Sequence, residues 1–192
     1  AVVEGRVLSS FTDGTILLEA RSGRLWTLSA KLVVGREKTE QTFLPLDAQE
    51  LAATVEKDAR KAGISGEFVT HETEHYIVVA TTGAAYAQWC GNLLERLQRA
   101  VLNFWKTRGL KMHEPASPLP VLILSNRDQF AKMAVFDRTP GSAAGLGYYL
   151  VTANRSVLFD LTTEQAGSNG GRTNVSESVS LAQVSRALQN SP

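Results

Sequence analysis

The sequence predicts an α+β fold in which a small N-terminal β meander or barrel-like module precedes an α/β mixed-sheet subdomain with one long helix. Three patterns predict it: short β-prone runs with Gly turns in the first 35 residues, a long amphipathic stretch near the middle, and a continuous apolar run after it. Of the 192 residues, 43% are hydrophobic, so the chain can build a core. We expect a β module at 1–44, a helical connector at 45–66 and the α/β subdomain at 67–192.

The module is predicted to hold three short strands, at about 3–8, 15–19 and 25–28. Asp13-Gly14 and Ser22-Gly23 lie between them, and glycine supplies the positive φ that tight hairpin turns require. Because these strands carry little apolar surface, we expect the module to be stabilised by packing against another part of the chain.

Two helices are predicted next. The first, at about 47–62, begins with the D-x-x-E pattern of Asp47 and Glu50, which is typical of a helix N-terminus. The second, at 82–107, has apolar residues at three- and four-residue steps, so one face is expected to be core. The members of this stripe are Tyr86, Trp89, Cys90, Leu93, Leu94, Leu97, Val101, Phe104 and Trp105.

The remaining elements follow an α/β pattern. Strands are expected at 68–71, 75–80 and 121–124, the last covered on both faces, and a hairpin at 146–160. A short helix is expected after 124, with Ser125 as its cap and Asp128 in its first turn. The Gly-rich stretch 162–176 is expected to be a mobile loop, and 177–189 a last amphipathic helix.

Composition excludes several classes of function. The formal charge is +1 with no evident basic block, which gives no support to a nucleic-acid or acidic-membrane partner. Cys90 is the single cysteine, so an internal disulfide and multi-cysteine zinc or iron–sulfur sites are excluded. No apolar run approaches the roughly 20 residues of a membrane span. The chain begins with Ala1 rather than methionine, and we therefore expect a processed or excised piece.

His71-Glu72-Thr73-Glu74-His75 matches the zinc motif H-E-x-x-H letter for letter. That chemistry needs a helix, where positions i and i+4 share a face; in a strand the two histidines lie roughly 13 Å apart. The flanking Thr, Val, Ile and Tyr residues favour strands, so we expect a hairpin tip with no metal site. The alternative is a zinc hydrolase that uses His71, Glu72 and His75, although His113 is a poor third ligand beside two prolines.

Other candidate residues have simpler explanations. Cys90 lies in the apolar stripe and is expected to be a buried thiol, and Ser125 lacks a G-x-S-x-G elbow. The glycines of 141–147 are not followed by a helix, as a dinucleotide loop would be. Asp160 and Glu164 could pair, but nothing places them in a cleft.

The order of segments resembles a known family. The segments are Glu74 to Val79, the long helix, Leu119 to Phe130, Ala144 to Tyr149 and Val157 to Asp160. They resemble a bacterial domain-of-unknown-function family related to the peptidase-MA-like (gluzincin) zinc metallopeptidases, over about residues 67–161. The resemblance implies a zincin-like N-terminal subdomain, in which the edge strand of a twisted mixed sheet lines the substrate cleft. The catalytic H-E-x-x-H helix comes later in that family, and no histidine follows Asp160 here.

We therefore expect a non-catalytic, N-terminal part of a zincin-like metallopeptidase. Gly147, Tyr148 and Tyr149 would offer an edge strand to a peptide or protein substrate. The resemblance implies no cofactor within this chain, zinc only in a catalytic half beyond Pro192, and, with the missing methionine, favours an exported protein. The alternative is a stand-alone binding or scaffold module. The metallopeptidase hypothesis predicts an exposed apolar surface for docking the catalytic half, and the stand-alone module predicts none.

Overall fold

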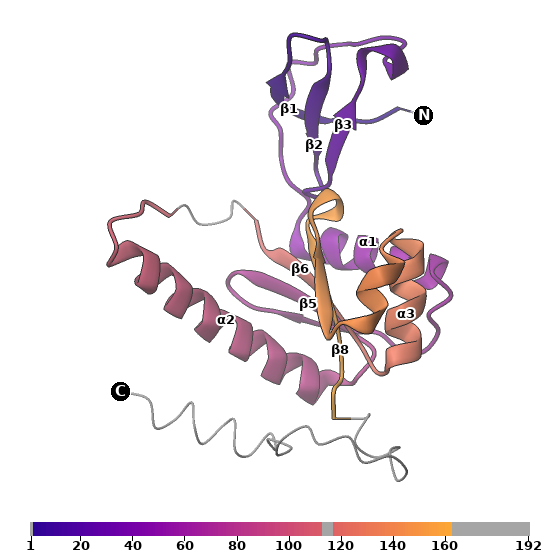
Figure 1. The fold of residues 1–192 in the computed structure, drawn as a ribbon, viewed down its shortest axis with the longest axis vertical. Helices are drawn as coiled ribbons and strands as arrows, with labels where there is room; N and C mark the ends of the chain where they lie inside the picture. The colour runs from indigo at the N-terminus through magenta and orange to yellow at the C-terminus, as the bar shows by residue number, and fades with distance from the viewer. Residues whose placement is uncertain (1, 113–116, 163–192) are drawn as a thin grey trace.

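The computed structural model describes residues 2–112 and 117–162 (Figure 1). The described part is a mixed α+β fold with two sheets, as predicted. The smaller sheet is an antiparallel meander of β1 (Gly5–Ser10), β2 (Ile16–Ala20) and β3 (Leu25–Leu28), followed by a 3-10 turn, η1 (Ala30–Leu32). Its two turns contain Gly14 and Gly23, both with positive φ.

The connector helix α1 (Ala48–Lys61) begins as its sequence predicts. Asp47 caps the helix by accepting a hydrogen bond from the Glu50 N–H, and the Glu50 side chain accepts one from the Asp47 N–H. This reciprocal box satisfies two main-chain donors that would otherwise lack a partner at the helix start.

The larger sheet has the strand order β4-β5-β6-β8-β7. Its centre is parallel, formed by β5 (Tyr76–Ala80), β6 (Leu119–Leu124) and β8 (Arg155–Phe159). Its two edges are antiparallel to their neighbours: β4 (Val69–Glu72) pairs with β5, and β7 (Gly147–Leu150) pairs with β8.

Helices cover both faces of this sheet. α1 and α3 (Arg127–Phe136) contribute to one core cluster, with side chains from β5, β6 and β8 beneath them. α2 (Ala84–Lys106) contributes to a second cluster on the opposite face. The apolar run of β6 is buried on both sides, which confirms its prediction as a central strand.

The cap of α3 differs from the prediction. The N-cap is Asn126, whose side-chain oxygen accepts the N–H of Gln129, and not Ser125. Serine and asparagine cap helices about equally well, so the sequence alone does not distinguish two adjacent candidates.

Only part of the apolar stripe of α2 lies in the core, which corrects the prediction that the whole stripe is buried. Ala87, Cys90 and Gly91 are its buried residues, all in the N-terminal third. Phe104 is 48% exposed and Trp105 is 39% exposed, although both were expected in the core. Figure 1 shows the C-terminal half of α2 extending past the strands of the sheet, so its apolar side chains have no sheet beneath them.

Several predictions lie outside the described residues: the helix at 177–189, His113, Glu164, and all but the first residue of the loop at 162–176. Across 2–112 and 117–162, no helix combines the length and apolarity that a membrane crossing requires.

Candidate functional site

The candidate site is the outer edge of β7. No other described strand pairs with this edge, because β7 is the last strand in the sheet order. The N–H and C=O groups of successive residues in a strand point to alternate sides. Asp160, just past β8, donates its N–H to the carbonyl of Leu124 on β6, so the even-numbered residues of β8 direct these groups toward β6. Odd-numbered residues of β8 such as Val157 therefore direct their N–H and C=O groups toward β7. Val157 lies opposite Tyr148, so the main chain of Tyr148 faces β8.

The residues on either side of Tyr148 face the other way. By the same alternation, Gly147 and Tyr149 direct their N–H and C=O groups away from β8 and toward the open edge. These groups have the spacing that an added antiparallel or parallel strand would need. Of the three edge-strand residues predicted from sequence, Gly147 and Tyr149 thus offer main-chain groups, while Tyr148 does not.

The two tyrosines of β7 have different surroundings. Tyr148 packs its ring on Phe130, with centroids 5.5 Å apart, and its hydroxyl donates to Asp137 at 2.8 Å. Tyr149 is 54% exposed and its hydroxyl donates to Asn154 at 2.6 Å. Tyr148 therefore anchors the strand to the core, and Tyr149 lies at the surface.

Gly147 lets β7 lie close to β8. A Cβ built at this position would lie 2.4 Å from Leu158 Cδ2 and 3.1 Å from the carbonyl oxygen of Val157. A larger residue would have to displace the Leu158 side chain, so glycine at this position lets Leu158 pack over the start of β7.

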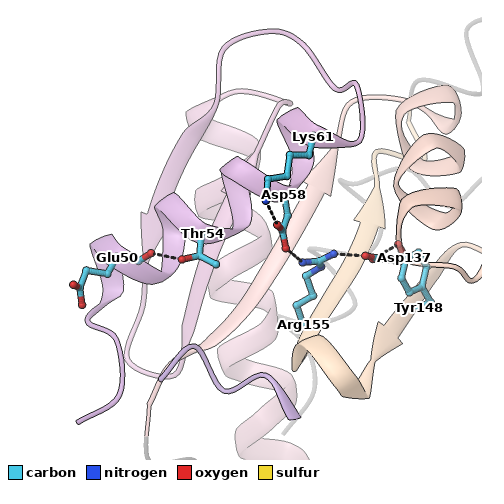
Figure 2. Close-up of polar contacts among 7 residues, drawn as sticks. All are labelled: Glu50, Thr54, Asp58, Lys61, Asp137, Tyr148 and Arg155. Carbon is cyan, nitrogen blue, oxygen red and sulfur yellow. Dashed lines mark hydrogen bonds and ion pairs between the residues drawn. The ribbon is translucent and has the colours of Figure 1, made fainter. Parts of the chain in front are cut away.

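A buried ionic network holds the β7–β8 hairpin (Figure 2). Arg155, at the start of β8, is 4% exposed and donates from Nη1 to Asp58 of α1 at 3.0 Å. Its Nη2 donates to Asp137 at the end of α3, which also accepts the Tyr148 hydroxyl. Burial raises the pKa of Asp137, and the Arg155 charge opposes that rise. No local motif predicts this network, because its members are far apart along the chain.

The H-E-x-x-H residues lie in the hairpin that the sequence predicts. His71 and Glu72 end β4, and His75 directly precedes β5. His71 is opposite Val78 in the antiparallel pair, and its ring lies over Gly91 of α2, where an added Cβ would meet His71 Cδ2 at 2.9 Å. The helical spacing that lets two histidines share one zinc is therefore absent from this segment.

His75 instead meets a residue that the motif did not include. Glu95 of α2 accepts the His75 main-chain N–H at 2.7 Å and faces the ring Nδ1 at 2.9 Å. It also accepts the Thr73 hydroxyl at 2.7 Å. Ligand atoms of Glu74, His75 and Glu95 lie within 4.8 Å of one another. Such a set has the donor types for a divalent cation. In the structure, however, Glu95 accepts hydrogen bonds from Thr73 and His75 and so holds the turn between β4 and β5 against α2.

We expect Glu95→Gln to weaken the fold in a pH-dependent way. Burial acts to raise the pKa of Glu95, but hydrogen bonds from Thr73 and His75 outweigh it and hold the pKa below the ordinary 4.5. An acid whose native pKa is lowered stabilises the fold above its unfolded pKa and loses that stabilisation as the pH falls through the native pKa. The difference in free energy of unfolding between wild type and Glu95→Gln should therefore be largest above pH 4.5 and shrink below it.

Urea unfolding across acidic pH measures this difference, with Glu74→Gln in the same turn as the exposed control. A difference between wild type and Glu95→Gln that grows as the pH falls below 4.5 would contradict the role assigned to the carboxylate.

Two further candidates lie near the carboxyl ends of the parallel strands. Cys90 is buried, as predicted, and burial together with the Asp160 carboxylate raises its pKa to about 11. A thiol with so high a pKa stays protonated at neutral pH and is a poor nucleophile. Ser125 donates its hydroxyl to Gln129 at 3.1 Å and its N–H to Thr81 at 3.0 Å, contacts that tie the end of β6 to its neighbours.

Comparison of the chain with protein-family models, with curated proteins and with solved structures gives no match.

Proposed function

We propose that the five-stranded unit is the substrate-presenting, non-catalytic subdomain of a zincin-like metallopeptidase, and that β7 pairs with an extended peptide. The peptide would add a strand beside Gly147 and Tyr149, in the mode known as β-augmentation. Zinc and the general base would come from residues other than those described.

The observation that carries the proposal is the open edge of β7. A row of outward main-chain donors and acceptors on a firmly held strand is a template for pairing with another chain. Gly147 and Tyr149 supply these groups, and Tyr148 and Arg155 hold the strand from within. Because β7 is already held in place, it would lose little conformational entropy on pairing with a peptide, and this favours affinity.

The sheet order gives a second line of support. The segments that resemble the peptidase-MA-like family form β5, α2, β6, β7 and β8. In that family an edge strand lines the substrate cleft, and here the antiparallel β7 borders an otherwise parallel centre. The resemblance thus assigns the substrate role to β7, one of the two edge strands of this sheet.

The exposed stripe of α2 favours a subdomain over a stand-alone module. Leu97, Val101, Phe104 and Trp105 are each more than a third exposed and recur on one face of the helix. An exposed apolar patch of this kind is typical of a surface that another part of a protein covers. The stand-alone hypothesis predicts no such patch.

The test is peptide binding by wild type and by Tyr149→Pro. Heptapeptides selected from a phage-displayed library against the intact chain would be synthesised and their Kd measured. Proline removes the outward N–H of residue 149 and leaves the β7–β8 ladder intact, since that N–H does not face β8. We expect the Kd of the best peptide to rise about tenfold, the cost of one lost main-chain hydrogen bond and an unpaired carbonyl.

Tyr149→Val is the matched control, because it loses the same phenol but keeps the N–H. Its Kd should lie clearly below that of Tyr149→Pro. Equal affinities for the two variants, or no selected peptide that binds the wild type, would overturn the proposed function.

A further inference from the structure

The N-terminal module touches the hairpin that carries the candidate edge. Figure 1 shows the lower end of the β1–β3 sheet above the loop that joins β7 to β8. The contact is close at Gly23, in the β2–β3 turn: a Cβ there would lie 2.6 Å from Nδ2 of Asn154. A side chain at this point would force the Asn154 amide to shift, and Gly23 also has a φ of +76°, which L side chains rarely adopt.

Asn154 connects this contact to the edge strand. It has the left-handed conformation, with φ 48° and ψ 46°, at the end of the 3-10 turn η3 (Val151–Ala153). Its side-chain oxygen accepts the hydroxyl of Tyr149 at 2.6 Å. One asparagine side chain therefore bridges the module turn and the residue whose N–H faces the open edge.

The module is attached to α1 on the other side of the same turn. The carbonyl of Arg21 accepts the N–H of Leu46 at 2.8 Å, and the Arg21 Nε donates to the carbonyl of Leu44 at 2.8 Å. Arg21 also lies 3.6 Å from the Glu50 carboxylate. The turn is thus held against the segment that leads into the connector helix.

The junction between module and sheet is lined by both polar and apolar side chains and is incompletely filled. A cavity of about 30 Å³ lies there, and its lining is mixed: polar Ser22, Arg24, Thr54, Asp58 and Arg155, and apolar Leu51, Val55, Pro120 and Ala153. Two parts of one chain can usually move relative to one another unless a large hydrophobic interface joins them.

We propose that docking of the N-terminal module on Asn154 sets the affinity of the β7 edge for an extended peptide. This inference rests on the proposed function and adds a regulatory input to it. With the module docked, Asn154 holds Tyr149 and the end of β7 in the geometry that pairing needs. Undocking frees the loop, and peptide binding must then order it. By linkage, a bound peptide in turn favours the docked module.

Gly23→Ala tests the inference, since its Cβ would collide with Asn154. We expect the Kd of the selected peptide to rise about fivefold or more, the usual range for coupled sites. Trypsin cleavage after Arg21 and Arg24 should become faster, and peptide should slow that cleavage in the wild type. Gly14→Ala is the matched control: its φ is +79°, in the other turn of the module, and its Cβ would meet Ala30 rather than Asn154. Its Kd should stay close to that of the wild type.

Asn154→Gly provides a second variant that keeps the left-handed backbone. It should weaken peptide binding about as much as Gly23→Ala, and the double variant should be no weaker than Asn154→Gly alone, because the collision partner is gone. Additive effects, or wild-type affinity in Gly23→Ala, would overturn the coupling and leave the edge proposal standing. Failure of any selected peptide to bind the wild type would overturn both.

Discussion

Replacement of Arg155 by leucine is expected to lower the free energy of unfolding by about 3–5 kcal/mol, the usual cost of breaking a buried ion pair. Asp137, whose side chain is 3% exposed, would lose its charged partner, and Asp58 would lose its contact with the sheet. The isolated carboxylate must then be protonated or remain charged in a poorly solvated site, and either outcome costs stability.

Urea unfolding at neutral pH measures this loss, and two further variants locate its source. Arg155→Leu combined with Asp137→Asn should recover part of the stability, because it removes the uncompensated charge. Lys61→Ala removes an exposed partner of Asp58 at 3.9 Å, and surface pairs of this kind contribute about 0–1 kcal/mol. If Arg155→Leu lowers the free energy of unfolding no more than Lys61→Ala does, the ionic network does not stabilise the β7–β8 hairpin.

Phe130→Ala is expected to cost about 3–5 kcal/mol, the range for a large aromatic side chain removed from a packed core. Phe130 lies on α3 and is fully buried. Its ring contacts Phe159 of β8 at 5.0 Å and Tyr148 of β7 at 5.5 Å between centroids. The substitution would leave a cavity between α3 and the two strands of the candidate site.

Phe104→Ala is the matched control for this substitution. It removes the same side chain from the exposed end of α2, where the cost should stay below about 1 kcal/mol. Equal losses for the two variants in urea unfolding would mean that α2 is covered or that α3 is loosely packed, and would contradict the core described above.

Local patterns in the sequence predict most of the elements, because each has a physical cause within a few residues. The Asp47–Glu50 box starts α1, Gly turns separate the strands of the module, and the apolar run of β6 marks a strand covered on both faces. The strand character of 69–80 likewise follows from its β-branched residues, and it explains why an H-E-x-x-H match lies in a hairpin.

The features that the sequence does not predict are those formed by residues far apart along the chain. Asp58 and Arg155 are 97 residues apart, so no local pattern connects them. Helical periodicity shows that α2 has an apolar face but not where the sheet beneath it stops, and Phe104 and Trp105 were misplaced for that reason. The outward direction of Gly147 and Tyr149 depends on the strand order, which only the assembled sheet provides.

Amide hydrogen exchange at Gly147 and Tyr149, resolved by NMR with and without a saturating selected heptapeptide, tests the central claim most directly. Both amides should exchange quickly in the free protein, since they face the open edge, while the amide of Tyr148, which faces β8, exchanges slowly. Peptide should slow exchange at Gly147 and Tyr149, whose N–H groups both face the edge, and leave Tyr148 unchanged. Slow exchange at both residues in the free protein, or no change on saturation with peptide, would contradict the assignment of β7 as the docking edge.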